Sequence, residues 1–125
     1  MAGEILLKGA LSMDMEPRYF KVATYLPQDK TEELIGALRE ITVNQIGNYS
    51  DCISYYPVQS TWTCLDGSTP YIGKPGEISR ETEDKVEFLC HEDDLRRAIS
   101  AIRRVHPYEQ PVIDIIPMYI AEDFD

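Results

Sequence analysis

The sequence predicts an α+β domain in which two strand-helix-strand units form one antiparallel sheet with both helices on the same face. The main observation is a repeat, because one amphipathic helix pattern occurs twice, 61 residues apart from Leu34 to Leu95, each time after a strand-like run. The chain has 125 residues, with 43% apolar and 27% charged side chains, which is typical of one globular domain. Two right-handed β-α-β units of this kind give a four-stranded sheet.

The first unit begins after an N-terminal extension, residues 1–17, which shows no sustained period. Residues 18–26 are rich in aromatic and β-branched side chains and end before Pro27, which predicts a strand. Asp29 and Glu32 have the spacing of a capping box and predict the start of a helix. The apolar positions of that helix are Leu34, Ala37, Leu38 and Ile41. Residues 49–58 supply the second strand.

The second unit repeats this order. Residues 85–90 alternate as in a strand, and three acidic residues at 92–94 mark a helix start. The apolar positions of this helix are Leu95, Ala98, Ile99 and Ile102. Pro107 ends the helix, and residues 112–119 predict a closing strand with Pro117 at an edge or bulge. The expected fold is therefore a ferredoxin-like βαββαβ plait over residues 18–120, followed by an acidic tail, 121–125.

The segment between the two halves is longer than a hairpin link needs. Residues 44–79 carry four glycines and three prolines. Residues 53–58 and 60–65 have strand composition and predict an extended β-hairpin, followed by a Gly/Pro-rich loop. The acidic residues of the next strand entry are expected to be solvated; they are Glu81, Glu83, Asp84 and Glu87.

Charge and targeting signals exclude several classes of function. The chain has 12 basic and 22 acidic residues, a net charge of −10, which disfavours nucleic acids and anionic membranes as partners. We find no apolar stretch of membrane-spanning length and no signal peptide at the N-terminus. Three cysteines suit a reducing compartment, so a cytoplasmic location is expected.

Metal ligands and thiols are present without a metal-binding spacing. Cys52, Cys64, Cys90, His91 and His106 include no C-x-x-C or H-x-x-x-H, and neighbouring Cys90 and His91 should face opposite sides of a strand. Ordinary thiols and a surface histidine explain the pattern. A reversible disulfide between Cys52 and Cys64, across the predicted hairpin, stays an alternative.

Two other features have both a functional and a structural interpretation. His106 lies beside the apolar stripe of its helix, so it either serves as a catalytic base or bonds the helix C-terminus and packs under Tyr108. Four arginines form a stripe that either attracts an anion or acidic partner or is simply a solvated helix face; they are Arg96, Arg97, Arg103 and Arg104.

Three runs of residues carry a family resemblance. They are Ile46-Gly47-Asn48-Tyr49-Ser50-Asp51-Cys52, Gly67-Ser68-Thr69-Pro70-Tyr71-Ile72-Gly73 and His106-Pro107-Tyr108-Glu109-Gln110-Pro111. They resemble the I-G-N-Y-x-x-C, G-x-x-P-x-x-G and H-P-Y-E-E-P signatures of the YqfO-type insert domain of the NGG-interacting-factor-three-like family. The chain departs from these patterns at Gln110 and at residues 60–64, where the family has G-x-G-x-F.

The resemblance implies a ferredoxin-like fold similar to the trimeric CutA and P-II proteins. Larger family members carry a dinuclear metal site on flanking lobes, and some are labelled GTP-cyclohydrolase-like. We do not expect those lobes in this chain, so we expect no catalytic residues, no resident cofactor and no transfer of the metal enzyme's activity.

The resulting hypothesis is a non-catalytic, self-associating regulatory or small-ligand-binding module, with a trimer as the expected assembly. A site is expected where residues 48–52 meet residues 106–109; its candidates are Asn48, Tyr49, Asp51, Cys52, His106, Tyr108 and Glu109. The alternative interpretation of these runs is structural, as a turn and a helix stop. The rival function is a metal-ion-binding protein of the divalent-cation-tolerance type, or a remnant of a metal-dependent hydrolase family, with His106 and Glu109 as candidate ligands.

Overall fold

The computed structural model describes residues 15–41 and 44–125. Most of the expected extension, residues 1–14, lies outside the described residues. The elements in chain order are β1 (Tyr19–Pro27), η1 (Gln28–Lys30), α1 (Thr31–Ile41), β2 (Ile53–Thr63), β3 (Ile78–His91), η2 (Glu92–Asp94), α2 (Leu95–Val105), β4 (Ile113–Met118) and η3 (Ala121–Phe124). None of the described helices has the length and apolar character of a membrane-spanning segment.

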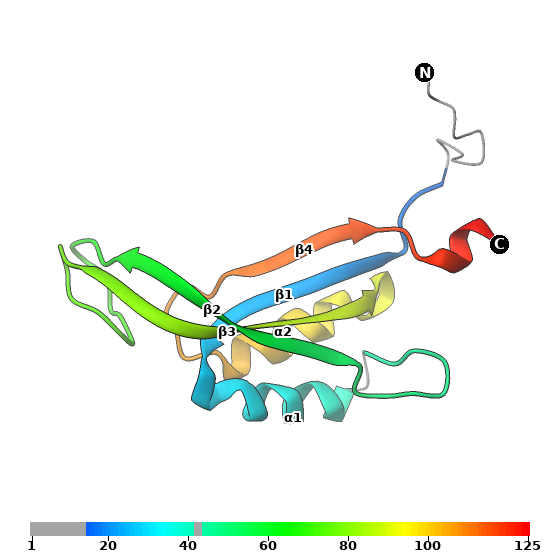
Figure 1. The fold of residues 1–125 in the computed structure, drawn as a ribbon, viewed down its shortest axis with the longest axis horizontal. Helices are drawn as coiled ribbons and strands as arrows, with labels where there is room; N and C mark the ends of the chain where they lie inside the picture. Colours follow the sequence, from blue (N-terminus) through cyan, green and yellow to red (C-terminus); the bar gives the residue numbers. More distant parts are fainter. Residues whose placement is uncertain (1–14, 42–43) are drawn as a thin grey trace, which may run out of the picture.

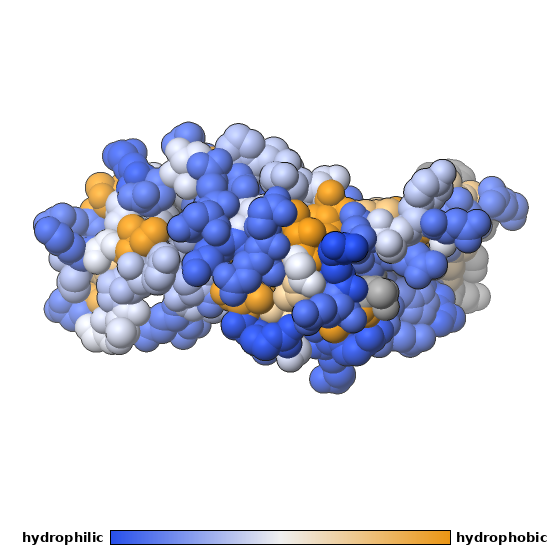
Figure 2. All heavy atoms as spheres, turned by 90° about the horizontal axis from the view of Figure 1, so that it is seen from below, coloured by the Kyte–Doolittle hydropathy of each residue, from blue (hydrophilic) through white to orange (hydrophobic). Residues whose placement is uncertain are grey.

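The four strands form one antiparallel sheet in the order β2-β3-β1-β4. Both helices lie on the same side of the sheet (Figure 1). This confirms the predicted ferredoxin-like plait. Seen from below, the molecule is mostly hydrophilic, with apolar patches between charged side chains (Figure 2).

The core lies between the sheet and the two helices, as the repeated helix pattern predicts. Val22 and Leu26 of β1 lie on the face of the sheet that the helices cover, and both are fully buried. Leu34 and Leu38 of α1 and Ile102 of α2 pack against them. Burying side chains of this size stabilises a fold by about 1.5–3 kcal/mol each.

Both edge strands contain a proline. Pro57 lies in β2 opposite Asp84, and Pro117 lies in β4 opposite Phe20. Proline lacks an N–H group and is tolerated in a sheet where that group would face outward, so both positions suit an edge. The predicted edge location of Pro117 is confirmed.

Two local predictions about the first half of the chain were wrong. Asp29 does not cap a helix, because residues 28–30 form the turn η1 and α1 begins only at Thr31. The predicted hairpin turn near Gln59 does not exist, because residues 53–63 are one continuous strand paired with β3. Alternation of strand-forming residues continues through this position, so composition alone did not distinguish a turn from a longer strand.

The corrected strand also excludes the Cys52–Cys64 disulfide alternative. These two cysteines flank the ends of β2, which at 3.3 Å per residue places them roughly 40 Å apart along the strand. All three cysteines carry free thiols. Cys90 is fully buried and its pKa is raised to about 11 because burial disfavours the thiolate.

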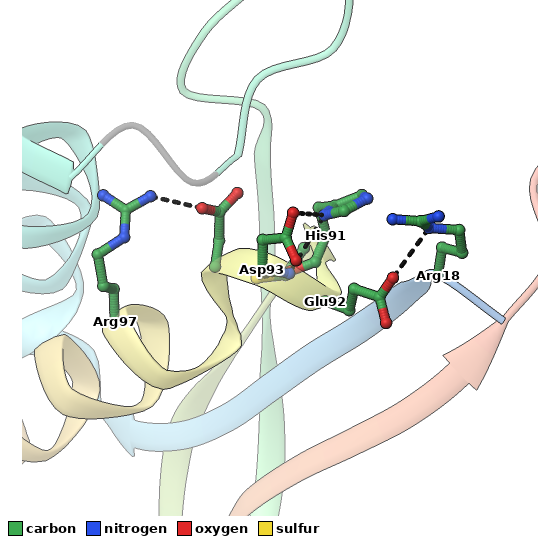
Figure 3. Close-up of polar contacts among 7 residues, drawn as sticks. Arg18, His91, Glu92, Asp93 and Arg97 are labelled. Atoms are coloured by element: carbon green, nitrogen blue, oxygen red, sulfur yellow. Dashed lines mark hydrogen bonds and ion pairs between the residues drawn. The ribbon is translucent and has the colours of Figure 1, made fainter.

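The start of α2 is held by a row of ion pairs (Figure 3). Arg18 Nε lies 2.9 Å from Glu92 Oε2, and the His91 ring accepts the backbone N–H of Asp93. Arg97 pairs with Asp94 and also donates to the Ile41 carbonyl at the end of α1 (3.0 Å). Of the four arginines in the stripe, Arg97 is therefore engaged in contacts within the molecule, as the structural interpretation expected.

The C-terminal residues are also part of the structure. The expected tail, 121–125, contains the turn η3, and Phe124 packs edge-on against Tyr119. Tyr119 Oη donates to the Met15 carbonyl (2.8 Å), which brings the two ends of the described chain together.

Asp84 connects β3 to the start of α1. Its side chain is 6% exposed and accepts hydrogen bonds from Thr31 Oγ1 (2.6 Å) and Gln28 Nε2 (3.2 Å). The prediction that this acid is solvated was wrong, because the chain turns through η1 and places both donors above it.

We predict that Asp84→Ala lowers the free energy of unfolding by about 1–3 kcal/mol, because it leaves the buried Thr31 hydroxyl without its partner. Asp29→Ala is the matched control; Asp29 is exposed, and its loss should change stability by less than about 0.5 kcal/mol. Urea denaturation of both variants measures the difference. Equal losses would contradict the assigned role of Asp84.

Candidate functional site

The candidate site is a cavity of about 540 Å³ beside the projecting end of the sheet. β1 ends at Pro27, opposite Glu83, whereas the β2–β3 pairing continues to Thr63 and Ile78. We call residues 59–82 the arm; it extends beyond the rest of the sheet (Figure 1). The cavity lies between the arm and the segment after α2, and its walls include Trp62, Ser68, Tyr71, Glu83, Tyr108 and Glu109.

Tyr108 is the central contact of the cavity. Its hydroxyl donates to Glu83 Oε2 (2.6 Å), and its ring lies 5.7 Å from the Trp62 ring and 6.1 Å from the Tyr71 ring. Burial and the bond to Glu83 hold the pKa of Tyr108 far above its usual range. Tyr108 therefore stays protonated and donates this hydrogen bond to Glu83 as a neutral group.

Glu83 is only 4% exposed, although the sequence analysis expected it to be solvated. It faces the opposite side of β3 from Asp84, towards the cavity, and Tyr108 covers it. That prediction was wrong because the covering residue lies 25 positions further along the chain. No local pattern reveals such a contact.

The loop of the arm folds back onto β2. Trp62 Nε1 donates to the Ile72 carbonyl (3.2 Å), and the Gly76 N–H donates to the Cys64 carbonyl (2.9 Å). Gly73 has φ +114°, and a Cβ there would lie 2.7 Å from Ser79 Oγ and 3.0 Å from Cys64 Sγ. Only glycine fits this position, so the second glycine of G-x-x-P-x-x-G has a packing role.

The loop also contacts the H-P-Y-E-Q-P run directly. The Thr69 N–H donates to Glu109 Oε1 (2.8 Å). Next to it, Ser68 Oγ is buried and has no hydrogen-bond partner, although it lies in the cavity wall. A buried hydroxyl without a partner is unusual and marks a place where a bound group would be stabilised.

His106 is buried next to the site and contacts both Tyr25 and Tyr108. Its ring is 7% exposed, Nε2 lies 2.7 Å from the Tyr25 carbonyl, and Nδ1 accepts the Tyr108 N–H (3.2 Å). Nε2 therefore carries the proton, and the ring packs 4.8 Å from that of Tyr108. The histidine bonds a strand carbonyl rather than the last carbonyls of its own helix, but it does pack against Tyr108 as the structural interpretation expected.

The two predicted halves of the site lie apart. Residues 48–52 follow a turn closed by Ile46 and Tyr49 and precede β2, while residues 106–109 lie near Val58 and the arm. The five steps along β2 from Ile53 to Val58 correspond to about 17 Å, and the ends of β2 are well separated in Figure 1. The expected meeting of the two runs was therefore wrong.

Within residues 48–52, the contacts are local. Asp51, at φ +59°, pairs with Arg39 of α1 (3.2 Å). Cys52 Sγ lies 3.6 Å from the Tyr49 carbonyl, and Asn48 and Tyr49 are exposed. Nearby Asn44 is 1% exposed, and neither atom of its side-chain amide has a partner. This run closes the turn between α1 and β2, and its ligand-binding role stays a prediction.

The candidate metal ligands are already engaged. Both ring nitrogens of His106 and one carboxylate oxygen of Glu109 take part in the hydrogen bonds described above. A metal at His106 would have to replace one of these bonds, so the pair does not fit a preformed metal site. In residues 15–41 and 44–125, no three His, Cys, Asp or Glu side chains are grouped as metal ligands.

We predict that Tyr108→Phe lowers the free energy of unfolding by about 1–3 kcal/mol, because the buried Glu83 carboxylate loses its donor. Tyr49→Phe removes a hydroxyl from a side chain that is 76% exposed and should have little effect. Thermal unfolding followed by circular dichroism compares the two. A Tyr108→Phe protein as stable as the control would show that the bond to Glu83 contributes nothing.

His106 should make stability depend on pH. Burial lowers the pKa of His106 below its ordinary value of 6.5, so the unfolded chain takes up this proton first. Stability from the neutral ring is complete above about pH 6.5 and is lost as the pH falls through the lower, folded-state pKa. Urea denaturation between neutral pH and about pH 5 should show a smaller loss for His106→Gln than for His91→Gln. Equal slopes would contradict a buried neutral His106.

Comparison with known proteins shows that the chain is similar to part of the GTP cyclohydrolase 1 type 2 homologs. It is 34% identical over 100 residues to a GTP cyclohydrolase 1 type 2 homolog of Staphylococcus epidermidis, covering 80% of this chain and 27% of that protein. It is 30% identical over 99 residues to the protein of the same name in Halalkalibacterium halodurans, with coverage of 79% and 27%. The chain thus spans about a quarter of the curated relatives it matches. No family model matches it.

Solved structures show the same relationship. A Bacillus cereus protein related to NIF3 superposes with a TM-score of 0.73 at 26% identity, over 85% of this chain and 27% of that one. CutA1 from Shewanella sp. SIB1 has a TM-score of 0.66 at 18% identity, over 86% and 87% of the two chains. The periplasmic divalent cation tolerance protein CutA of Archaeoglobus fulgidus has a TM-score of 0.63 at 17% identity, over 83% and 89%.

The resemblance read from the three motifs is confirmed: the chain is a homologue of part of the GTP cyclohydrolase 1 type 2 homologs, the NIF3/YqfO proteins, and shares its ferredoxin-like fold with CutA.

Proposed function

We propose that this chain is a non-catalytic module that binds a small organic ligand in the cavity beside the arm and assembles with copies of itself. The observation that carries the proposal is the cavity, whose volume of about 540 Å³ lies within the range of small-molecule sites, roughly 300–1,000 Å³. Its aromatic walls and few polar groups are typical of such sites. A regulatory role would follow if the ligand orders the arm.

Two features support self-association. β2 and β4 are edge strands with no further strand beside them in the described part of the chain. The sheet face opposite the helices carries apolar side chains, among them Ile116, which is 52% exposed, and Tyr56, 43% exposed. On the same face, Lys85 Nζ lies 5.6 Å from the Tyr25 ring and 5.9 Å from the Tyr56 ring. An uncovered sheet face of this kind suits contact with a second copy.

We expect native mass spectrometry of the untagged protein, isolated from cells, to show an oligomer and a co-purified small molecule. A trimer has three times 14.3 kDa, about 43 kDa. Ile116→Glu should shift sedimentation towards the monomer, because it places a charge on the contact face. Ile46→Glu is the control; Ile46 is 51% exposed but lies in the turn before β2. A 14.3 kDa species alone at micromolar concentration would remove the proposed assembly.

The second candidate is a protein that handles divalent cations, favoured by the similarity in fold to the divalent cation tolerance protein CutA of Archaeoglobus fulgidus. Elemental analysis of untagged protein tests it. Stoichiometric metal that is lost in Glu109→Gln, and retained in the control Glu40→Gln, would support this candidate over an organic ligand.

A further inference from the structure

We propose that the ligand of the cavity is an organic cation, an apolar or aromatic skeleton that carries a protonated amine or quaternary ammonium group. This inference rests on the proposed function, since it names the chemical class that the same cavity selects. It follows from the charge of the walls, the arrangement of the aromatic rings and one buried hydroxyl.

The walls of the cavity carry negative charge only. Glu83 and Glu109 line it, and none of its lining residues is a lysine, arginine or histidine. Among the ion pairs of the described residues, none includes either glutamate. Glu83 is 4% exposed and receives a hydrogen bond from neutral Tyr108, and no cation of residues 15–41 and 44–125 pairs with it. A bound cation would balance its charge, whereas a phosphate or carboxylate ligand would be repelled.

Three aromatic rings from three separate segments surround the same space. Trp62 comes from β2, Tyr71 from the loop of the arm, and Tyr108 from the segment after α2. The ring of Tyr108 is tilted by 52° to that of Trp62 and by 45° to that of Tyr71, so the rings do not stack flat on one another. Centroid distances near 6 Å are those of rings in contact, so the three rings form one aromatic wall, and ring faces that line the cavity attract a cationic group through their quadrupoles.

Lys85, two positions from Glu83 along β3, is used elsewhere. Lys85 lies on the same side of β3 as Glu83, but its ammonium group pairs with Glu87 (3.7 Å) and lies over the rings of Tyr25 and Tyr56. The hydrogen bond with Tyr56 raises the pKa of Lys85, so it stays charged in that position. Lys85 does not line the cavity and forms no ion pair with Glu83 or Glu109, so both glutamates can interact with a ligand.

Ser68 Oγ gives a second, independent indication of a ligand. This atom is buried in the cavity wall and has no partner, while the neighbouring Thr69 N–H is satisfied by Glu109. Because this oxygen has almost no accessible surface, the Ser68 side chain has to rotate towards the cavity before a hydroxyl or N–H group of a ligand bonds it.

The test uses three probes with one phenyl skeleton and different charge: phenethylammonium, 2-phenylethanol and phenylacetate. Trp62 is the only tryptophan of the chain and lies in the cavity wall, so its fluorescence reports binding directly. We expect phenethylammonium to bind about tenfold more tightly than 2-phenylethanol, and phenylacetate to bind most weakly.

Charge-neutralising variants locate the effect. Glu109→Gln should reduce the preference for phenethylammonium over 2-phenylethanol several-fold. Glu40→Gln makes the same change on the exposed surface of α1, away from the cavity, and should keep the full preference. Because Glu109 is exposed, this variant avoids the loss of stability expected at the buried Glu83.

The outcomes separate the two proposals. If phenylacetate or the alcohol binds as tightly as phenethylammonium, the cavity still binds small molecules, and the cation inference is overturned. If Glu40→Gln loses as much preference as Glu109→Gln, the selectivity comes from overall charge and the site inference is overturned. If no probe changes Trp62 fluorescence up to roughly 10 mM, both the inference and the proposed cavity fall.

Discussion

The structure depends on two neighbouring carboxylates in β3 that are buried on opposite sides of the sheet. Asp84 faces the helices, where Thr31 and Gln28 hold it at the start of α1, and Glu83 faces the cavity, where Tyr108 covers it. A buried carboxylate without a donor is costly, so each of these contacts stabilises the folded chain. The first contact fixes where α1 begins, and the second fixes the path of the chain after α2. A shift of β3 by one residue would exchange the two acids and break both.

The periodic parts of the fold could be predicted from the sequence, and the site could not. Leu34 and Leu38, and later Ala98 and Ile102, recur at helical spacing and are buried as that spacing requires. The arm was misjudged because strand-forming composition continues through Gln59, and only the register with β3 shows that β2 does not turn there. The cavity combines β2, the loop of the arm and the segment after α2. Its contacts span from 10 residues, Trp62 to Ile72, to 40 residues, Thr69 to Glu109, and no local pattern encodes them.

The comparisons show one fold in two settings. In the NIF3-related protein of Bacillus cereus it matches 27% of the chain, whereas in the CutA of Archaeoglobus fulgidus it matches 89%. The second case shows that this arrangement of strands and helices makes up nearly a whole protein chain elsewhere. The core explains why, since α1, α2 and one face of the sheet bury a continuous apolar cluster without help from a further domain.

The prolines of the two edge strands limit how copies of this chain can join. A strand that adds to β2 or β4 from outside meets one position, Pro57 or Pro117, that offers no N–H group. Open-ended addition of strands, as in amyloid-like fibres, needs continuous backbone N–H and C=O groups for hydrogen bonding along both edge strands of the sheet. Each border here is interrupted near the middle or the end of its strand, which discourages polymerisation and favours closed assemblies of limited size.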